Sequence, residues 1–84
     1  MNKEKFIKTL QEKLNIDENT AIIINNTIEN NNIFIKKNKD KIINEIMDAL
    51  KIDLEKANNI YETTMNIITT TLKNKLKHPF KSID

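Results

Sequence analysis

Apolar side chains recur along this chain at the three-to-four residue spacing of amphipathic helices. The first such stretch covers residues 3–14, and the next follows an aspartate that can cap a helix N-terminus. The second half shows the same order, with a cap at Asn38, an apolar-faced stretch, then Asp53 and a longer stretch that must end before Pro79. This pattern predicts four helices. The residues expected in their core are Phe6, Ile7, Leu10, Leu14, Ile24, Ile28, Ile43, Ile46, Leu50, Ile60, Ile67, Ile68 and Leu72.

The second half of the chain is also an imperfect copy of the first, because residues 2–30 align with residues 38–66 without a gap. A repeat of this length is typical of one supersecondary unit that buries its apolar face only against a neighbouring unit. We therefore expect an all-α fold, in which two helical hairpins in tandem form one four-helix domain with pseudo-two-fold symmetry. The expected parts of this single domain (1–84) are repeat one (2–32), a connector (33–37), repeat two (38–76) and a tail (77–84).

The two copies differ on what should be a solvent-facing side of the second helix. Repeat one has Ile22 and Ile23 where repeat two has Asn58 and Asn59. These two isoleucines, together with Phe34 of the connector, are the predicted protein-contact surface. The alternatives are that Phe34 packs over them within one chain, or that they line a groove for a partner.

The connector itself contains three successive apolar residues, Ile33, Phe34 and Ile35. They are compatible with a short strand, a helix extension or an apolar plug over the end of the helix bundle. The sequence offers no obvious second strand for pairing, which favours the plug.

Composition excludes several classes of function. The 84 residues include no glycine and no cysteine, so glycine-rich phosphate loops, dinucleotide-binding turns, disulfides and thiolate metal sites are not expected. The single histidine, His78, cannot build a two-histidine zinc site. Aromatic residues make up only 5% of the chain, so the core must be aliphatic, with Tyr61 at its edge and the tyrosine hydroxyl in water. No stretch approaches the roughly 20 apolar residues of a membrane span, and the N-terminus resembles no secretory leader, so we expect a cytoplasmic protein without membrane contact.

No arrangement of side chains predicts catalysis. Glu45 and Asp48 share a helix face, but a di-metal helical bundle would need acids on facing helices and histidines in a Glu-x-x-His pattern. The threonine run at 69–71 has no base placed to activate a hydroxyl. We therefore expect no enzyme activity, no cofactor, no bound metal and no small-molecule substrate.

Lysines are unevenly distributed, although the net charge is only +2 and all fourteen positive charges are lysine. One cluster follows each repeat, and each is a candidate contact to a phosphate backbone that would add a salt-dependent increment to binding. The alternative is that both clusters are solvated helix ends. The absence of arginine, the usual bidentate reader of guanine, argues against sequence-specific recognition. The clusters are Lys36, Lys37, Lys39 and Lys41, and Lys73, Lys75, Lys77 and Lys81.

Repeat two resembles the N-terminal helical hairpin of the HU/IHF family of bacterial DNA-architectural proteins. The resemblance rests on the opening stretch NKDKIINEI at 38–46, the turn at 51–53 and Ala57 at the start of the next helix. Residues 2–32 fit the same hairpin less fully. The resemblance implies a dimerisation core in which two hairpins, fused here in one chain, pack together. The family's three-stranded sheet and its arm, which wedges a proline into the minor groove, have no counterpart in this sequence.

Two functions follow from these observations. The first is a small non-enzymatic protein-interaction or assembly module that contacts a protein partner or a second copy of itself, for instance as a homodimer, through Ile22, Ile23 and Phe34. The alternative is a non-specific nucleic-acid-associated protein, similar to HU, that uses the two lysine clusters.

Overall fold

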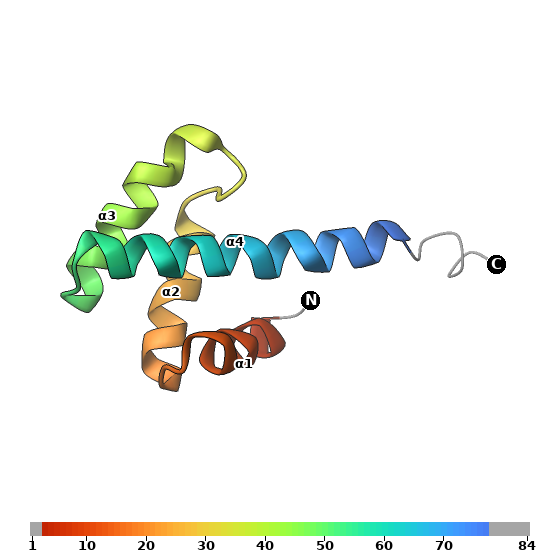
Figure 1. Ribbon diagram of the computed structural model, residues 1–84, viewed down its shortest axis with the longest axis horizontal. Helices are drawn as coiled ribbons and strands as arrows, with labels where there is room; N and C mark the ends of the chain where they lie inside the picture. The colour runs from red at the N-terminus through yellow and green to blue at the C-terminus, as the bar shows by residue number, and fades with distance from the viewer. Residues whose placement is uncertain (1–2, 78–84) are drawn as a thin grey trace.

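The computed structural model describes the backbone of residues 3–77 and the side chains of residues 3–71. This part of the chain consists mainly of four α-helices and one short 3₁₀ helix, and it contains no strand. The elements, drawn in Figure 1, are α1 (Lys3–Leu14), α2 (Glu18–Asn30), the 3₁₀ helix η1 (Lys36–Asn38), α3 (Lys39–Leu50) and α4 (Leu54–Lys77). The predicted all-α fold with four helices is therefore confirmed.

The helices pack in a closed order. Within the repeats α1 contacts α2 and α3 contacts α4, and between the repeats α2 contacts α3 and α1 contacts α4. A two-fold relation between the repeats would give this same order, because it exchanges α1 with α3 and α2 with α4. The two repeats differ in the length of their second helix, because α4 has 24 residues and α2 has 13. α4 therefore projects beyond the other helices (Figure 1).

The turns inside the two repeats have the same backbone geometry. Asn15 and Lys51 follow α1 and α3 in the left-handed region, with φ of 54° and 57°. After each of them, the isoleucine of the turn (Ile16 or Ile52) donates its N–H to the carbonyl five residues earlier, at 3.2 Å in both repeats. This hydrogen bond defines a Schellman motif, which usually has glycine at the left-handed position. Since the chain contains no glycine, asparagine and lysine occupy that position here.

Aspartates cap the second helix of each repeat, as predicted. Asp17 Oδ1 accepts a hydrogen bond from the N–H of Thr20 at 2.8 Å, and Asp53 Oδ1 accepts one from the N–H of Lys56 at 2.9 Å. Hydrogen bonds from the side chain and the backbone of Thr20 lower the pKa of Asp17 from its ordinary value, because they stabilise the charged carboxylate.

The core is aliphatic and draws on all four helices. Its buried members are Phe6, Leu10, Ala21, Ile24, Ile33, Ile42, Ile43, Ile46, Ala57, Ile60, Tyr61 and Ile67. Five other positions predicted for the core are partly buried against it, namely Ile7, Leu14, Ile28, Leu50 and Ile68. Leu72 lies outside the side chains that the structure describes. Tyr61 is only 6% exposed, so its predicted place at the edge of the core is wrong and its ring is part of the core.

Buried polar groups join the two repeats. The Asn31 side-chain amide donates to the carbonyl of Thr27 at 3.0 Å and to both carboxylate oxygens of Glu45 at 3.2 Å. These bonds tie the end of α2 to α3. By contrast, two buried atoms among the described side chains, Asn25 Nδ2 and Thr64 Oγ1, have no hydrogen-bond partner. Among the described buried polar residues, Asn31 and Thr27 are hydrogen-bonded, whereas Asn25 and Thr64 each have one unsatisfied atom.

Candidate binding surfaces

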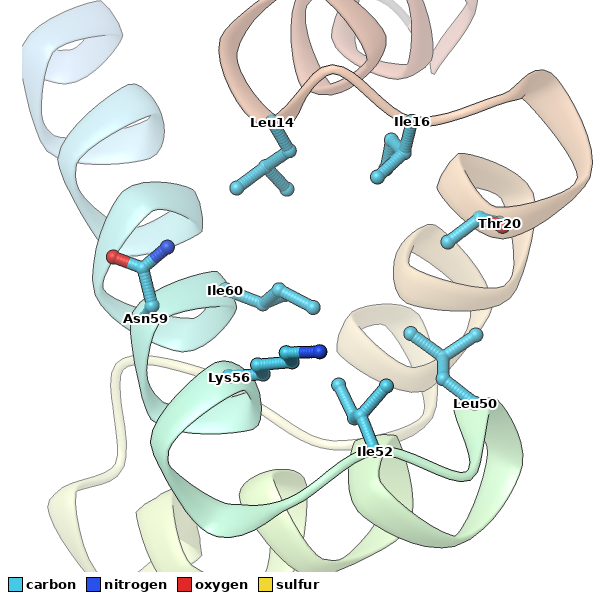
Figure 2. Close-up of a pocket in the computed structure, with 8 residues that line it drawn as sticks. All are labelled: Leu14, Ile16, Thr20, Leu50, Ile52, Lys56, Asn59 and Ile60. Carbon is cyan, nitrogen blue, oxygen red and sulfur yellow. The ribbon is translucent and has the colours of Figure 1, made fainter.

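The turns of the two repeats lie side by side and border a hollow of about 340 Å³. Figure 2 shows the turn after α1 facing the turn after α3, with the beginnings of α2 and α4 on either side. We call this feature the turn hollow. It is lined by Leu14, Ile16, Thr20, Leu50, Ile52, Lys56, Asn59 and Ile60.

The walls of the turn hollow repeat because the turns repeat. Leu14 and Leu50 occupy equivalent positions of the two copies, and so do Ile16 and Ile52. Each isoleucine follows the left-handed residue of its Schellman motif, a position whose side chain commonly packs back on the preceding helix end. All four are partly buried against the core. The hollow is therefore apolar on two opposite sides, one from each repeat.

Lys56 supplies the charge of the turn hollow. In Figure 2 its side chain extends from α4 towards the centre of the hollow, between Ile52 and Ile60. A lysine ammonium in apolar surroundings is attracted to the face of an aromatic ring. Sites for drug-sized ligands commonly measure about 300–1,000 Å³, so a hollow at the lower limit suits one large side chain better than a cofactor.

Two other hollows border α1, and most of the residues that line them are polar. One of about 600 Å³ is lined by charged side chains of α1 and by Glu18. The other, of about 370 Å³, lies between α1 and α4 and is lined mostly by threonines. Neither has the paired apolar walls of the turn hollow.

The connector between the repeats is held by asparagine hydrogen bonds. Asn32 Oδ1 accepts from the N–H of Phe34 at 3.0 Å. The Asn32 carbonyl accepts from the N–H of Ile35 at 3.1 Å and from the side-chain amide of Asn38 at 3.0 Å. Asn38 occupies the predicted N-cap position of α3, but its side chain makes no capping hydrogen bond. Its amide fixes the connector instead.

Only one of the three apolar connector residues enters the core. Ile33 is 4% exposed, whereas Phe34 is 57% and Ile35 41% exposed. The backbone here forms a turn, not a strand or an extension of α2, and the predicted apolar plug is Ile33 alone. Phe34 and Ile35 form an exposed pair that we call the connector tip.

The first predicted lysine cluster lies directly beside the connector tip. Its four members are exposed and belong to η1 and the first turn of α3; they are Lys36, Lys37, Lys39 and Lys41. Lys39 Nζ lies 5.7 Å from the ring centroid of Tyr61, a cation–π contact that holds this lysine against the core. The structure therefore places exposed apolar and cationic side chains on one segment.

The second predicted lysine cluster belongs to the end of α4. Lys73, Lys75 and Lys77 are in its last turns, but their side chains lie outside the described part of the structure. Lys81 and the rest of the predicted tail beyond Lys77, including His78, also lie outside it.

The predicted contact residues of α2 are separate from the connector tip. Ile22 and Ile23 are each partly exposed. Ile22 lies about 12 Å along the helix from Asn30, where α2 ends. Phe34 is more than half exposed, so it does not cover these isoleucines as a buried lid. The predicted contact surface thus has one part on α2 and one on the connector.

Sequence reasoning does not predict the turn hollow. Its apolar walls are present in the sequence as a Leu-x-Ile-Asp pattern at 14–17 and again at 50–53. Each copy by itself indicates only a helix end and a cap. The hollow forms only because the packing of α2 on α3 brings both turns to one end of the bundle.

Neither a metal centre nor a membrane span is found in the described residues. No cluster of three or more histidine, cysteine, aspartate or glutamate side chains there could hold a metal ion, and no helix there combines the length and the apolar character needed to cross a bilayer. Comparison of the chain with protein-family models, curated proteins and solved structures finds no match. The likeness to the HU/IHF hairpin therefore stays an expectation from the sequence.

Proposed function

We propose that this chain is a small non-enzymatic protein-interaction module that assembles with copies of itself. The exposure of Phe34 on a hydrogen-bonded connector carries the proposal. Burial of a phenylalanine side chain contributes about 1.5–3 kcal/mol, and a backbone that is already ordered loses little conformational entropy on binding. Phe34 with Ile35 is therefore suited to anchor a contact.

The lysines beside the connector tip fit the same function. Protein interfaces commonly have an apolar centre and a polar, solvent-accessible rim. Lys36 and Lys37 follow the tip directly and are exposed, so they would form one side of such a rim. Rim charges steer association and select a partner surface of opposite charge. We therefore expect the surface that receives the tip to be acidic around an apolar centre.

The mass of the protein in solution tests the proposal. Light scattering from about 10 μM to about 1 mM, a range that reports weak to moderate affinities, should show a mass that rises with concentration. Phe34→Ser should lower this association, and Phe34→Leu, which keeps an apolar side chain, should retain much of it. A wild-type chain that stays monomeric at the highest concentration would show that the proposed self-association is wrong.

The α2 part of the predicted surface needs a separate variant. Replacing Ile22 and Ile23 by asparagine copies the residues found at the equivalent positions of repeat two. If these isoleucines contribute, the double variant should associate more weakly and keep its helical circular dichroism. If it unfolds, the two residues belong to the packed interior and not to a contact surface.

Non-specific nucleic-acid association is the second candidate function. The observation that favours it is the exposure of Lys36, Lys37 and Lys41 next to an exposed aromatic ring, because cationic grooves with aromatic side chains are common in single-strand binding proteins. The resemblance to the HU/IHF hairpin points to the same class of ligand.

A titration with random duplex and single-stranded DNA tests this candidate. Binding should be measurable at about 50 mM salt and much weaker at about 200 mM, since each neutralised phosphate releases counterions. Replacement of Lys37 by glutamate should weaken binding to every sequence, and so should replacement of Lys73. Absence of binding at the lower salt concentration would exclude this function.

A further inference from the structure

The connector tip and the turn hollow lie at opposite ends of α2 and α3. The first turn precedes α2 and the connector follows it, whereas the connector precedes α3 and the second turn follows it (Figure 1). α3 has 12 residues, which corresponds to a length of about 18 Å. Phe34 of one chain therefore cannot reach the turn hollow of the same chain while the bundle is folded.

These two ends also have opposite charge. Residues 12–20 contain three acids and one lysine, and residues 48–56 contain three acids and two lysines, so the two segments around the turn hollow have a combined net charge of −3. Residues 31–41, around the connector tip, contain four lysines and one aspartate, for a net charge of +3. Because the two ends of one folded chain cannot meet, their opposite charges favour contact between different molecules.

Exposed large apolar side chains are found at these same two ends. Among the described residues they are Phe34 and Ile35 at the connector, and Leu54, 60% exposed, directly after the second turn. Leu54 stands where repeat one has Glu18, so it adds apolar surface next to the turn hollow without a counterpart in the other copy.

We infer that the turn hollow receives the Phe34 side chain of a second copy of this chain, so that the molecules associate head to tail. This inference rests on the self-association proposed above and specifies which surface meets which. The lysines of the connector would then face the acids of the two turns. Such a contact is heterologous: a pair of molecules keeps one unused tip and one unused hollow. The assembly therefore closes into a ring if the rotation allows it, and otherwise extends as a filament.

The chemistry of the turn hollow fits a phenylalanine ring. Five of the eight residues that line it are leucine or isoleucine, Thr20 and Asn59 are polar, and its single cation is Lys56. Another lysine of this chain makes a cation–π contact, since Lys39 Nζ lies 5.7 Å from the centroid of the Tyr61 ring. An incoming Phe34 ring would give Lys56 an equivalent cation–π partner. A purely electrostatic contact between the two ends would have no need for the apolar walls.

Two complementary variants test the inference. Phe34→Ser removes the tip and leaves the hollow intact. Asn59→Arg acts on an exposed residue that lines the hollow, and places a long cation where the lysine-rich tip of the next molecule would approach. Each variant alone should associate more weakly, with a Kd at least about tenfold higher, as is typical when a hot-spot residue is lost. Asn66→Arg, the same substitution at an exposed position of α4 outside the hollow, is the matched control and should associate like the wild type.

A mixture of the two variants gives the decisive measurement. The intact hollow of Phe34→Ser can receive the intact tip of Asn59→Arg, so an equimolar mixture should form one-to-one heterodimers that grow no further, as measured by sedimentation velocity. A symmetric dimer formed through two tips would not be restored by mixing. If Asn59→Arg does not fold, Thr20→Arg on the opposite wall (Figure 2) replaces it.

The outcomes separate this inference from the proposed function. If the wild type associates but the hollow variants associate equally well, or if the mixture stays monomeric, the head-to-tail contact is wrong and self-association through another surface stands. If the wild type itself stays monomeric, both are wrong. Association that is lost in each variant and recovered in the mixture supports both.

Discussion

Lys51 is the position at which one substitution should stabilise this fold. Its φ of 57° lies in the left-handed region, which is less favourable by about 1–2 kcal/mol for a residue that has a Cβ atom. Glycine removes this strain but also adds conformational freedom to the unfolded chain, at a cost of about 0.4–1 kcal/mol. The difference predicts that Lys51→Gly raises the free energy of unfolding by about 0.5–1 kcal/mol. For a domain of this size, we expect the Tm to rise by about 2–8 °C.

The repeat provides a matched comparison for this prediction. Asn15 has nearly the same φ, 54°, but asparagine tolerates the left-handed region better than lysine, so Asn15→Gly should have a smaller effect than Lys51→Gly. Lys51→Ala removes the same charge but keeps a Cβ atom and should give no gain. Thermal and urea unfolding followed by circular dichroism would measure all three. If Lys51→Ala stabilises the protein as much as Lys51→Gly, the backbone-strain explanation is refuted.

Three other side chains give further predictions. Thr64→Val keeps the shape of the side chain and removes a buried hydroxyl without a partner, so urea unfolding should show a gain of about 1 kcal/mol; a loss would mean that the hydroxyl is satisfied in solution. Asn31→Ala removes both hydrogen bonds to Glu45 and should lower the unfolding free energy by about 1–3 kcal/mol in the same assay. Because the pKa of Asp17 is lowered in the fold, its contribution to stability is present above its unfolded pKa and is lost as pH falls through its folded pKa. The Tm difference between wild type and Asp17→Asn should therefore shrink from pH 7 to pH 3, and a constant difference would contradict this origin.

Local structure was predictable from the sequence because it depends on few neighbouring residues. Asp17 and Asp53 cap helices in both copies, since a cap needs only an acceptor next to the first free N–H groups. The helical period also located Leu10 and Ile46, which are fully buried. Asn38 is the N-cap residue of α3 as predicted, but its side chain does not cap the helix, because its amide donates to the Asn32 carbonyl instead.

The connector and the candidate binding surfaces depend on contacts that no local pattern encodes. Three successive apolar residues have no helical period, so the sequence did not indicate that Ile33 would be buried and Phe34 exposed. That choice follows from the turn that the Asn32 hydrogen bonds impose. The turn hollow is still harder to predict from the sequence, because it forms only where two turns 36 residues apart meet.

Fusing two equivalent hairpins in one chain makes the two ends of the domain different. A dimer of separate hairpins would have no connector, and symmetry would make its two halves the same. In the fused chain the two turns repeat and together form one hollow, whereas the connector occurs once and presents one tip. The duplicated residues thus line the hollow that we propose as the receiving surface, and two residues of the connector, Phe34 and Ile35, are exposed. Since the tip and the hollow lie at opposite ends of the molecule, each contact between a tip and a hollow would add the next molecule in the same direction.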